Sequence, residues 1–494
     1  MIRTQAAILA VLATISAGIA SAQTPAAPVE RSGFAQPTPH AILNEFLAEL
    51  PASRGFRSTV LATTREGREV RAIWLSRPDL PAREGQKLRV LLFAQQHGDE
   101  PSGKEALTLL LADCARGVCD DLLDRMDLVV VAQMNPDGAE RHQRRTADGI
   151  DLNRSHLLLH SPEVRGLHDL FFSWMPEVTV DVHEYGSFSR EWMDGGFIKT
   201  SDVQLGMLTN LNSPSSLRRF QHEWVYPAVQ AAMARAGYSF SEYIVGSPAD
   251  RLRHSTTEIN DGRQSFGILG TLSFIQEGRK WRSVEDQLER RARSQYTALG
   301  GLLRCIAERA PEVRAIVSAA RAGLPKLAGS TVITRMDHFP SQPRPAIPVW
   351  KVNEGKDTVW TVMPYHGRVV PVDSIVLPVA YVIPRELSAV RELLERHHVR
   401  FDTITKPARL RLGEYAVDTI GVVVIEEDSL PAPGLRLLST VRELRPGDLV
   451  VPTDQWHSLF LASALEPASL WGLLKYPAFT VDLVSNGRYR ILRR

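Results

Sequence analysis

Four short apolar segments recur along the first 300 residues, and few polar residues interrupt them. They span residues 89–94, 127–132, 178–182 and 272–275, and they are rich in β-branched or aromatic side chains. Short apolar runs of this kind are typical of strands that are buried on both faces of a sheet. The sequence therefore predicts a buried β-sheet at the centre of the fold.

Amphipathic patterns predict helices around these strands. The helical patterns cover residues 42–50, 104–111, 162–174, 216–236 and 284–307, and alternating patterns at residues 60–62 and 68–75 predict two further strands. Strands that alternate with helices form a sheet with a layer of helices on each face. We therefore predict an α/β fold with a mixed, mostly parallel sheet and helices on both faces, over residues 41–325.

The pattern changes after about residue 320. Proline-rich segments separate short alternating strands there, and residues 386–397 give the one clear helical pattern. Proline punctuates strands because it lacks the N–H that a strand ladder needs. We predict a β-rich C-terminal accessory domain over residues 330–494.

The N-terminus has the pattern of an export signal. Arg3 precedes an apolar stretch over residues 6–20, and Ala20-Ser21-Ala22 is a small-x-small cleavage site. The apolar stretch is short for a bilayer, and no later segment matches even that length without charges. We predict a signal peptide over residues 1–22, a Pro/Ala-rich linker over residues 23–40, and a periplasmic or secreted chain without a membrane span after cleavage.

Charge and cysteine content narrow the classes of function. The 494 residues include 58 Lys+Arg and 56 Asp+Glu, a formal charge of +2, which argues against a nucleic-acid binder. Cys114 and Cys119 could form a disulfide after export, with Cys305 left over, although free thiols fit equally well. Three cysteines without a CxxC pair exclude a zinc site built from cysteines alone. The sequence predicts no oligomeric state.

Polar residues follow each of the four buried strands. His97 and Glu100 come after the first strand, His183 after the third and Glu277 after the fourth. These residues would meet, because ligands in open α/β sheets bind at the carboxyl ends of the strands. Two imidazoles and one carboxylate with an open position form a catalytic zinc site, which favours His97, Glu100 and His183 as ligands. Rival histidines lie in loop or helix patterns: His142, His156, His160 and His168.

A longer series of motifs resembles one known family. The series runs His97-x-x-Glu100, Asn135-Pro-Asp-Gly138, Arg144, Gly149-Ile-Asp-Leu-Asn-Arg154, Asp181-Val-His183 and Glu277. In this order it resembles the zinc carboxypeptidase (carboxypeptidase A-like) family, over residues 45–310. The C-terminal domain is similar to the tails of some bacterial, exported members.

The resemblance implies a role for each matching residue. It implies one Zn²⁺ per chain on His97, Glu100 and His183, and an outer carboxylate, Asp151, that orients the first histidine. Glu277 would be the general base toward a zinc-activated water. Arg144 would polarise the scissile carbonyl, and Asn153 and Arg154 would bind the terminal carboxylate of the substrate. The implied activity is hydrolysis of the C-terminal amide bond of peptides.

The sequence departs from the family pattern at two points, and two other functions remain open. No tyrosine stands shortly before Glu277 as it usually does in the family, and Tyr243 is the nearest candidate. Arg263 could select acidic side chains, although neighbouring charges of both signs fix no preference. The same metal site would also serve a zinc amidohydrolase or deacylase that acts on acyl-amino acids or cell-wall stem peptides. A catalytically silent binding protein of the same fold is the alternative from another class.

Overall fold

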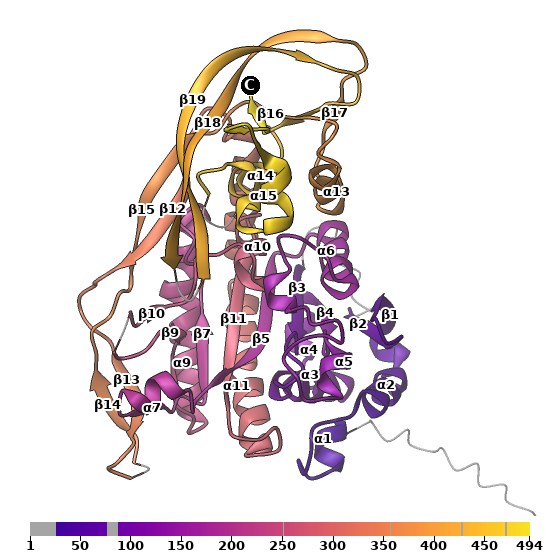
Figure 1. Ribbon diagram of the computed structural model, residues 1–494. Helices are drawn as coiled ribbons and strands as arrows, with labels where there is room; N and C mark the ends of the chain where they lie inside the picture. The colour runs from indigo at the N-terminus through magenta and orange to yellow at the C-terminus, as the bar shows by residue number, and fades with distance from the viewer. Residues whose placement is uncertain (1–25, 77–86, 250, 356, 426–427, 470–471) are drawn as a thin grey trace, which may run out of the picture.

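A mixed eight-stranded sheet forms the centre of the molecule (Figure 1). The computed structural model describes residues 26–76, 87–249, 251–355, 357–425, 428–469 and 472–494, so the expected signal peptide lies outside the described residues. Strands β4, β3, β5 and β11 run parallel. Strand β2 pairs antiparallel with β4, and β7 pairs antiparallel with β11. At the two edges, β1 pairs antiparallel with β2 and β8 pairs parallel with β7. This confirms the predicted fold class. The strands, in sheet order, are β1 (Phe56–Thr63), β2 (Glu69–Leu75), β4 (Met126–Val131), β3 (Leu88–Ala94), β5 (Val178–Gly186), β11 (Leu272–Lys280), β7 (Val203–Gly206) and β8 (Phe240–Glu242).

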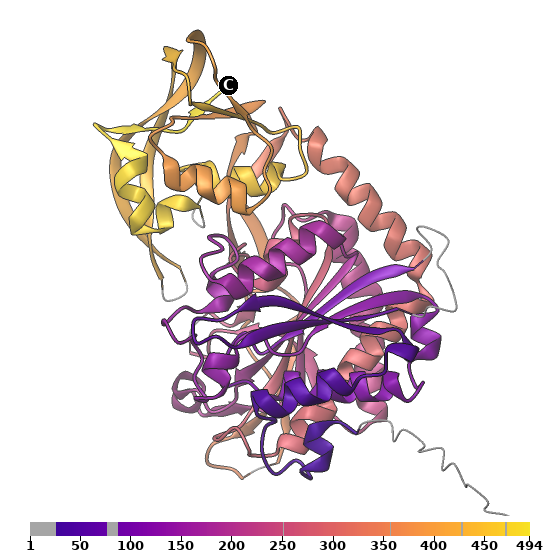
Figure 2. The ribbon, with the colours of Figure 1, turned by 90° about the vertical axis from the view of Figure 1, so that its right-hand side faces the viewer.

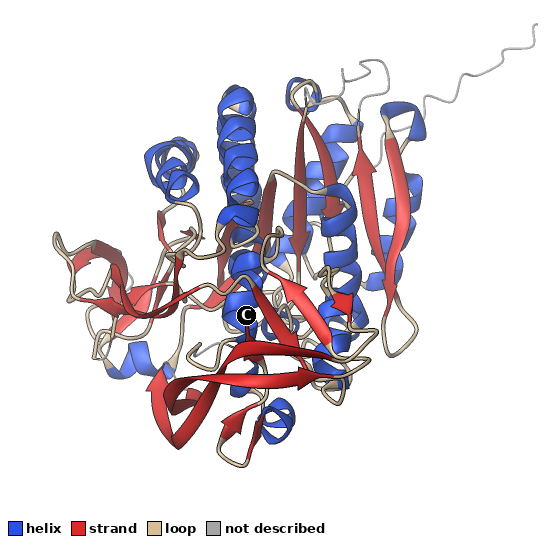
Figure 3. Ribbon diagram, turned by 90° about the horizontal axis from the view of Figure 1, so that it is seen from above, coloured by secondary structure: helices blue, strands red, loops and turns tan. Residues whose placement is uncertain are grey.

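Helices cover both faces of this sheet, and Figure 3 shows them in blue beside the red strands. The alternation of side chains along a strand gives two cores: Val90 and Leu92 of β3 pack with one helix layer, and Leu91 and Phe93 pack with the other. The first layer contains α2 (His40–Glu49), α3 (Ser102–Ala115), α9 (Tyr226–Arg235), α11 (Leu288–Glu308) and α12 (Ala310–Gly323). The second contains α6 (Pro162–Trp174) and α10 (Gly262–Gly267).

Two of the predicted segments differ in detail. The helix expected over residues 216–236 is divided into α8 (Ser215–Phe220), a π-helical turn (Gln221–Val225) and α9. Pro227 lies in the first turn of α9 and has no N–H to continue a regular α-helix through the turn before it. In the expected linker, α1 (Pro28–Arg31) is helical and Val29 is fully buried, so the described part of this segment packs on the α/β unit.

The C-terminal region is rich in strands, as predicted. Its most extended part is the hairpin of β18 and β19, which arches over the top of the molecule in Figure 1. The strands are β12 (Thr331–Phe339), β13 (Ala346–Lys351), β14 (Val359–Val362), β15 (Arg368–Val376), β16 (Ala380–Ile383), β17 (Asp402–Thr403), β18 (Ala408–Ile425), β19 (Asp428–Leu444), β20 (Leu449–Pro452), β21 (Val484–Ser485), β22 (Arg488–Tyr489) and β23 (Leu492–Arg493). The helices are α13 (Ser388–Arg396), α14 (Ser458–Leu465) and α15 (Pro477–Leu483).

This region packs closely on the α/β unit, above it in Figure 2. Phe171 of α6 stacks on Trp456, which precedes α14, with ring centroids 5.9 Å apart and planes 8° apart. A second contact is a shared sheet, in which β13 pairs with β6 (Phe197–Lys199) of the α/β unit. The boundary near residues 325–330 stays a prediction, but the two regions share one hydrophobic core.

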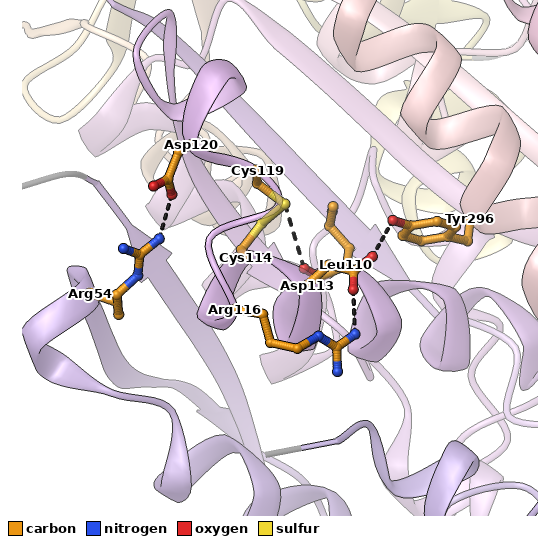
Figure 4. The surroundings of a disulfide bond; sticks show 8 residues. All are labelled: Arg54, Leu110, Asp113, Cys114, Arg116, Cys119, Asp120 and Tyr296. Atoms are coloured by element: carbon orange, nitrogen blue, oxygen red, sulfur yellow. Dashed lines mark hydrogen bonds and ion pairs between the residues drawn. A yellow bond between two sulfur atoms is a disulfide. The ribbon is translucent and has the colours of Figure 1, made fainter. Parts of the chain in front are cut away.

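A disulfide joins Cys114 near the end of α3 to Cys119 just before α4 (Asp120–Leu123), as Figure 4 shows. The structure thus decides between the two states that the sequence left open. Cys305 is a buried free thiol. Within the described residues, no helix combines the length and the apolar character that crossing a bilayer requires.

Candidate functional site

Two glycine-containing turns pack backbone to backbone at the carboxyl end of the sheet. A Cβ on Gly98 would lie 2.1 Å from the carbonyl carbon of Gly138, so this contact requires glycine. The Asn135 side chain links the turns, because its Nδ2 donates to the carbonyls of Gln96 and Arg144 at 3.2 Å each. These contacts explain the Asn-Pro-Asp-Gly motif, since it fixes the turn that carries His97 and Glu100.

The three predicted metal ligands meet at one point. Their candidate ligand atoms all lie within 4.8 Å of one another, and the three residues are buried. The Nδ1 atoms of His97 and His183 are 3.1 Å apart. The Glu100 carboxylate contacts both imidazoles, with Oε1 2.9 Å from His97 Nδ1 and Oε2 3.0 Å from His183 Nδ1. The structure therefore brings together the ligand set that was predicted from sequence.

A carboxylate holds the far nitrogen of each imidazole. Asp151 Oδ1 lies 3.2 Å from His97 Nε2, and Asp181 Oδ1 lies 2.8 Å from His183 Nε2. These contacts orient both rings so that Nδ1 faces the common point, as outer carboxylates do for metal-binding histidines. The motif series predicts this role for Asp151 but not for Asp181. The signal was available, because Asp181 and His183 are two apart on β5 and so share one face of the strand.

Charge within this cluster shifts several pKa values. Burial alone would raise the pKa of Glu100, but contacts with His97 and His183 outweigh burial and hold it well below its usual range. The same balance, with His97 and Arg144, holds the pKa of Asp151 below its usual range. Burial would lower the pKa of His183, but Asp181 and Glu100 raise it well above its usual value. The cluster is thus built to hold positive charge.

Glu277 stands beside the ligands. It is the register partner of His183 on the adjacent parallel strand, which places it next to the third ligand. Burial, reinforced by the nearby Glu100 carboxylate, raises the pKa of Glu277 to about 7. Tyr243 lines the same cavity as Glu277, and burial together with this carboxylate raises the pKa of Tyr243 well above its usual value. The tyrosine that is distant in sequence is therefore close in space.

His183 and Glu277 lie inside their strands, although we expected them just beyond the strand ends. Strands β5 and β11 continue to Gly186 and Lys280, because main-chain pairing persists after the apolar pattern stops. The polar side chains interrupt the hydrophobic signal without interrupting the ladder.

The three predicted substrate-binding residues lie in the lining of the same cavity as the ligands. Arg144 donates from Nε to Asp151 Oδ2 at 3.0 Å, and its side chain is 44% exposed. Asn153 Oδ1 accepts from the backbone N–H of Gly262 at 2.9 Å, so its Nδ2 group remains as a donor. Arg154 is exposed. Amide and guanidinium donors of this kind suit a carboxylate ligand.

One cavity of about 480 Å³ collects these groups. It is lined by all the predicted site residues except Asp151, which lies behind His97: His97, Glu100, Arg144, Asn153, Arg154, His183 and Glu277. Sequence reasoning missed Lys199 and Trp192 in the wall, and they gave no signal because they stand outside every motif. Arg263 is fully buried, pairs with Asp261 at 3.0 Å and is not among the lining residues.

Solved structures of related proteins match part of the chain. The metallo-carboxypeptidase from Burkholderia cenocepacia aligns with a TM-score of 0.41 and 21% identity, over 54% of this chain and 70% of that chain. The carboxypeptidase A from Helicoverpa armigera aligns with a TM-score of 0.43 and 16% identity, over 56% of this chain and 75% of that chain.

Sequence comparisons give the family. Residues 43–186 match the family model described as zinc carboxypeptidase. The chain is 24% identical to "Carboxypeptidase 2" of Trichophyton tonsurans over 482 residues, which cover 93% of this chain and 87% of that protein. It is also 26% identical to "Probable carboxypeptidase 2" of Trichophyton verrucosum over 291 residues, 57% of this chain and 56% of that protein. Residues 43–186 therefore belong to a zinc carboxypeptidase domain, the domain of a family of metal-dependent hydrolases.

Proposed function

We propose that this protein is an exported zinc metallocarboxypeptidase that hydrolyses the C-terminal amide bond of peptides. One observation carries the proposal: a metal-ligand triad, a buried carboxylate with a raised pKa and a set of carboxylate-binding donors line the same cavity. Each of these features alone has a structural explanation, but their convergence is what amide hydrolysis at a chain end requires.

The donor set fits one zinc ion. Two imidazole nitrogens and one carboxylate point at a common position, and Asp151 and Asp181 hold the other imidazole nitrogens. This is the composition of a catalytic zinc site with an open position. Bound zinc supplies Lewis acidity, which polarises a carbonyl and makes water a stronger acid.

Glu277 moves the proton. Its carboxylate is poised near neutrality, with a pKa of about 7, so it can accept a proton from a water molecule and release it to the leaving amine nitrogen. No covalent intermediate is needed, because the carboxylate serves first as base and then as acid. Tyr243 interacts with this carboxylate and lines the same cavity, so it can position the carboxylate.

The arginines and Asn153 bind the substrate. Arg154 and Asn153 provide guanidinium and amide donors for the terminal carboxylate, which favours removal of residues from the chain end over internal cleavage. Arg144 Nη1 lies 3.6 Å from Glu100 Oε1, beside the ligand triad, where its charge can stabilise the oxyanion that develops on the scissile carbonyl.

Two features support export. The first 22 residues have the pattern of a cleavable signal peptide, and Cys114 and Cys119 form a disulfide. Disulfides persist in oxidising compartments such as the periplasm and the extracellular space.

Metal analysis and peptide cleavage test the proposal together. We expect one zinc per chain in the mature protein and stepwise release of C-terminal residues from a peptide library, abolished by a chelator and restored by zinc. Glu277→Gln removes the base and keeps the hydrogen-bonding shape, so we expect zinc at the same stoichiometry without activity.

Other results would redirect or reject the proposal. Cleavage of acyl-amino acids or cell-wall stem peptides without release from ordinary peptides would support the amidohydrolase. Zinc binding without hydrolysis of either class would support the silent binding protein. Absence of zinc from the protein would overturn the site itself.

A further inference from the structure

Lys199 is a buried cation in the wall of the cavity. It ends β6, is only 7% exposed, and lines the same cavity as Glu277, Tyr243 and Arg154. Its ammonium lies 4.7 Å from the ring centroid of Tyr185 and 5.2 Å from that of Trp192. Aromatic faces stabilise a cation without neutralising it. A charge is therefore held in the wall of the cavity.

The hydrogen-bonding capacity of Lys199 is mostly unused. Among the described residues, Nζ donates one long hydrogen bond, to the carbonyl of Ile244 at 3.3 Å, and no carboxylate lies within ion-pair distance. Burial lowers the pKa of Lys199 to about 8, and the carboxylates of Glu277 and Glu191 oppose this decrease, so the ammonium form predominates at neutral pH. A buried ammonium with spare donors favours an anionic ligand.

Other charged side chains around the cavity already have partners. Lys280 pairs with Asp99, Asp261 pairs with Arg263 at 3.0 Å, and Glu184 pairs with the buried Arg291 at 2.7 Å. Arg154 has its place at the terminal carboxylate. Lys199 is thus the cation in the cavity wall that can bind the side chain of the C-terminal residue of the substrate.

The C-terminal region fixes the position of Lys199. Val349 of β13 is its register partner, and an apolar cluster that includes Trp192, Ile244 and Ile347 supports this wall. Trp192 is held in turn, because its Nε1 donates to the Gly246 carbonyl at 2.7 Å. Lys199 therefore lies in a wall of the cavity that strand pairing and a packed apolar cluster hold in place.

We propose that Lys199 makes the enzyme select substrates whose C-terminal residue has an acidic side chain, Asp or Glu. The proposal rests on the proposed carboxypeptidase function and names its substrate class. A charge-assisted hydrogen bond between Nζ and the side-chain carboxylate replaces the weak contact with Ile244. Arg263, which the sequence offered for this role, pairs with Asp261 and does not line the cavity.

Blocked peptides that differ only in the C-terminal residue test this selection with the zinc-loaded enzyme. We expect kcat/KM for Glu to exceed that for Gln by about tenfold to a hundredfold, since the pair differs only in charge. Lys199→Met should bring the Glu/Gln ratio close to one while Leu is still released, and Lys199→Arg should restore the preference for Glu. The matched control is Lys280→Met, which removes a cavity lysine already paired with Asp99 and should leave the ratio unchanged.

Equal cleavage of Glu and Gln by the wild type would overturn the proposal, as would a Glu preference that survives in Lys199→Met. If Lys199→Met does not fold, calorimetric binding of free glutamate and glutamine to the wild type decides, with tighter glutamate binding expected. Failure to release any residue from any peptide would instead reject the proposed function, and the same binding comparison would still test the selectivity of the wall.

Discussion

The protein buries two groups of histidines whose surroundings differ in kind. The metal-site histidines, His97 and His183, lie among the carboxylates of Glu100, Asp151 and Asp181. The second group lies among aromatic rings between α6, α10 and the C-terminal region, where His397 is 4.1 Å from Phe460 and His168 is 4.7 Å from Phe266, measured between ring centroids. We call the second group the interface histidines: His156, His168, His397 and His457.

The two groups are buried alike, but the pKa of His183 and the pKa values of the interface histidines shift in opposite directions. Carboxylates raise the pKa of His183 against the effect of burial. Burial lowers the pKa of His156 and His397 to about 3, and no carboxylate is close enough to reverse it. The interface histidines therefore stay neutral and donate to neutral partners, as His397 does to the Leu157 carbonyl at 2.7 Å. The charge of the neighbouring groups, and not burial, therefore decides which imidazoles can form a metal site.

The largest expected effect comes from exchanging one histidine in each group. His183→Ala removes a ligand, so we expect loss of both zinc and measurable activity. His397→Gln keeps a donor toward Leu157, so we expect full zinc content and retained activity. Elemental analysis and peptide cleavage check both variants. Loss of zinc in His397→Gln would contradict the separation of the two groups.

Acid should destabilise the protein through the interface histidines. The folded chain keeps His397 neutral with a pKa of about 3, whereas the unfolded chain binds a proton near 6.5. The stabilising contribution of this histidine is complete above pH 6.5 and is lost as the pH falls toward 3, by about 1.4 kcal/mol per pH unit. Urea unfolding of the wild type and His397→Gln between pH 7 and pH 4 should show a shallower pH dependence in the variant. Equal slopes would contradict this account.

The outer carboxylate of the metal site has a smaller expected effect. Asp181→Asn weakens the contact that orients His183, and we expect zinc affinity to fall by about tenfold to a hundredfold. Competition with a chromophoric chelator measures this affinity. Asp202→Asn serves as the control, since Asp202 is equally buried but pairs with Arg290 away from the ligands.

The smallest effect should come from the residue that joins the two groups. Gln96 donates to Asp181 Oδ2 at 2.8 Å and accepts from His156 Nε2 at 2.9 Å. Gln96→Met removes both contacts, so we expect zinc affinity to fall severalfold and the free energy of unfolding to fall by about 1 kcal/mol. Chelator competition and urea unfolding should both respond, whereas Asp181→Asn should act mainly on zinc. A change in only one of the two readouts would show that Gln96 does not connect the groups.

Much of the fold and the clustering of His97, Glu100 and His183 could be predicted because their signals are local. Strand β3 is an apolar run interrupted only by Arg89, and His97 and Glu100 follow it within six residues. The fixed order of the motifs then identified Asp151 and Glu277. The motifs that identify these residues are short stretches of sequence, so they can be recognised in a single chain.

The rest depends on contacts between distant segments. Tyr243 reaches Glu277 through the packing of separate strands, and Lys199 enters the cavity wall on a short strand with no motif. His156 and His168 could be set aside as ligands from sequence, but their place beneath Phe266 depends on tertiary packing. The pairing of β13 with β6 likewise cannot be predicted from the sequence of either strand, since each is only a short segment without a distinctive pattern.

The pairing of β13 with β6 has a consequence for the synthesis and folding of the chain. Val349 pairs with Lys199, a separation of 349 − 199 = 150 residues along the chain. A ribosome or an export channel releases the chain from its N-terminus, so the metal ligands and Glu277 emerge long before β13 does. The wall beside Lys199 is completed only when this later segment arrives. The timing of synthesis therefore separates the appearance of the polar groups in the cavity from the completion of the wall that surrounds them.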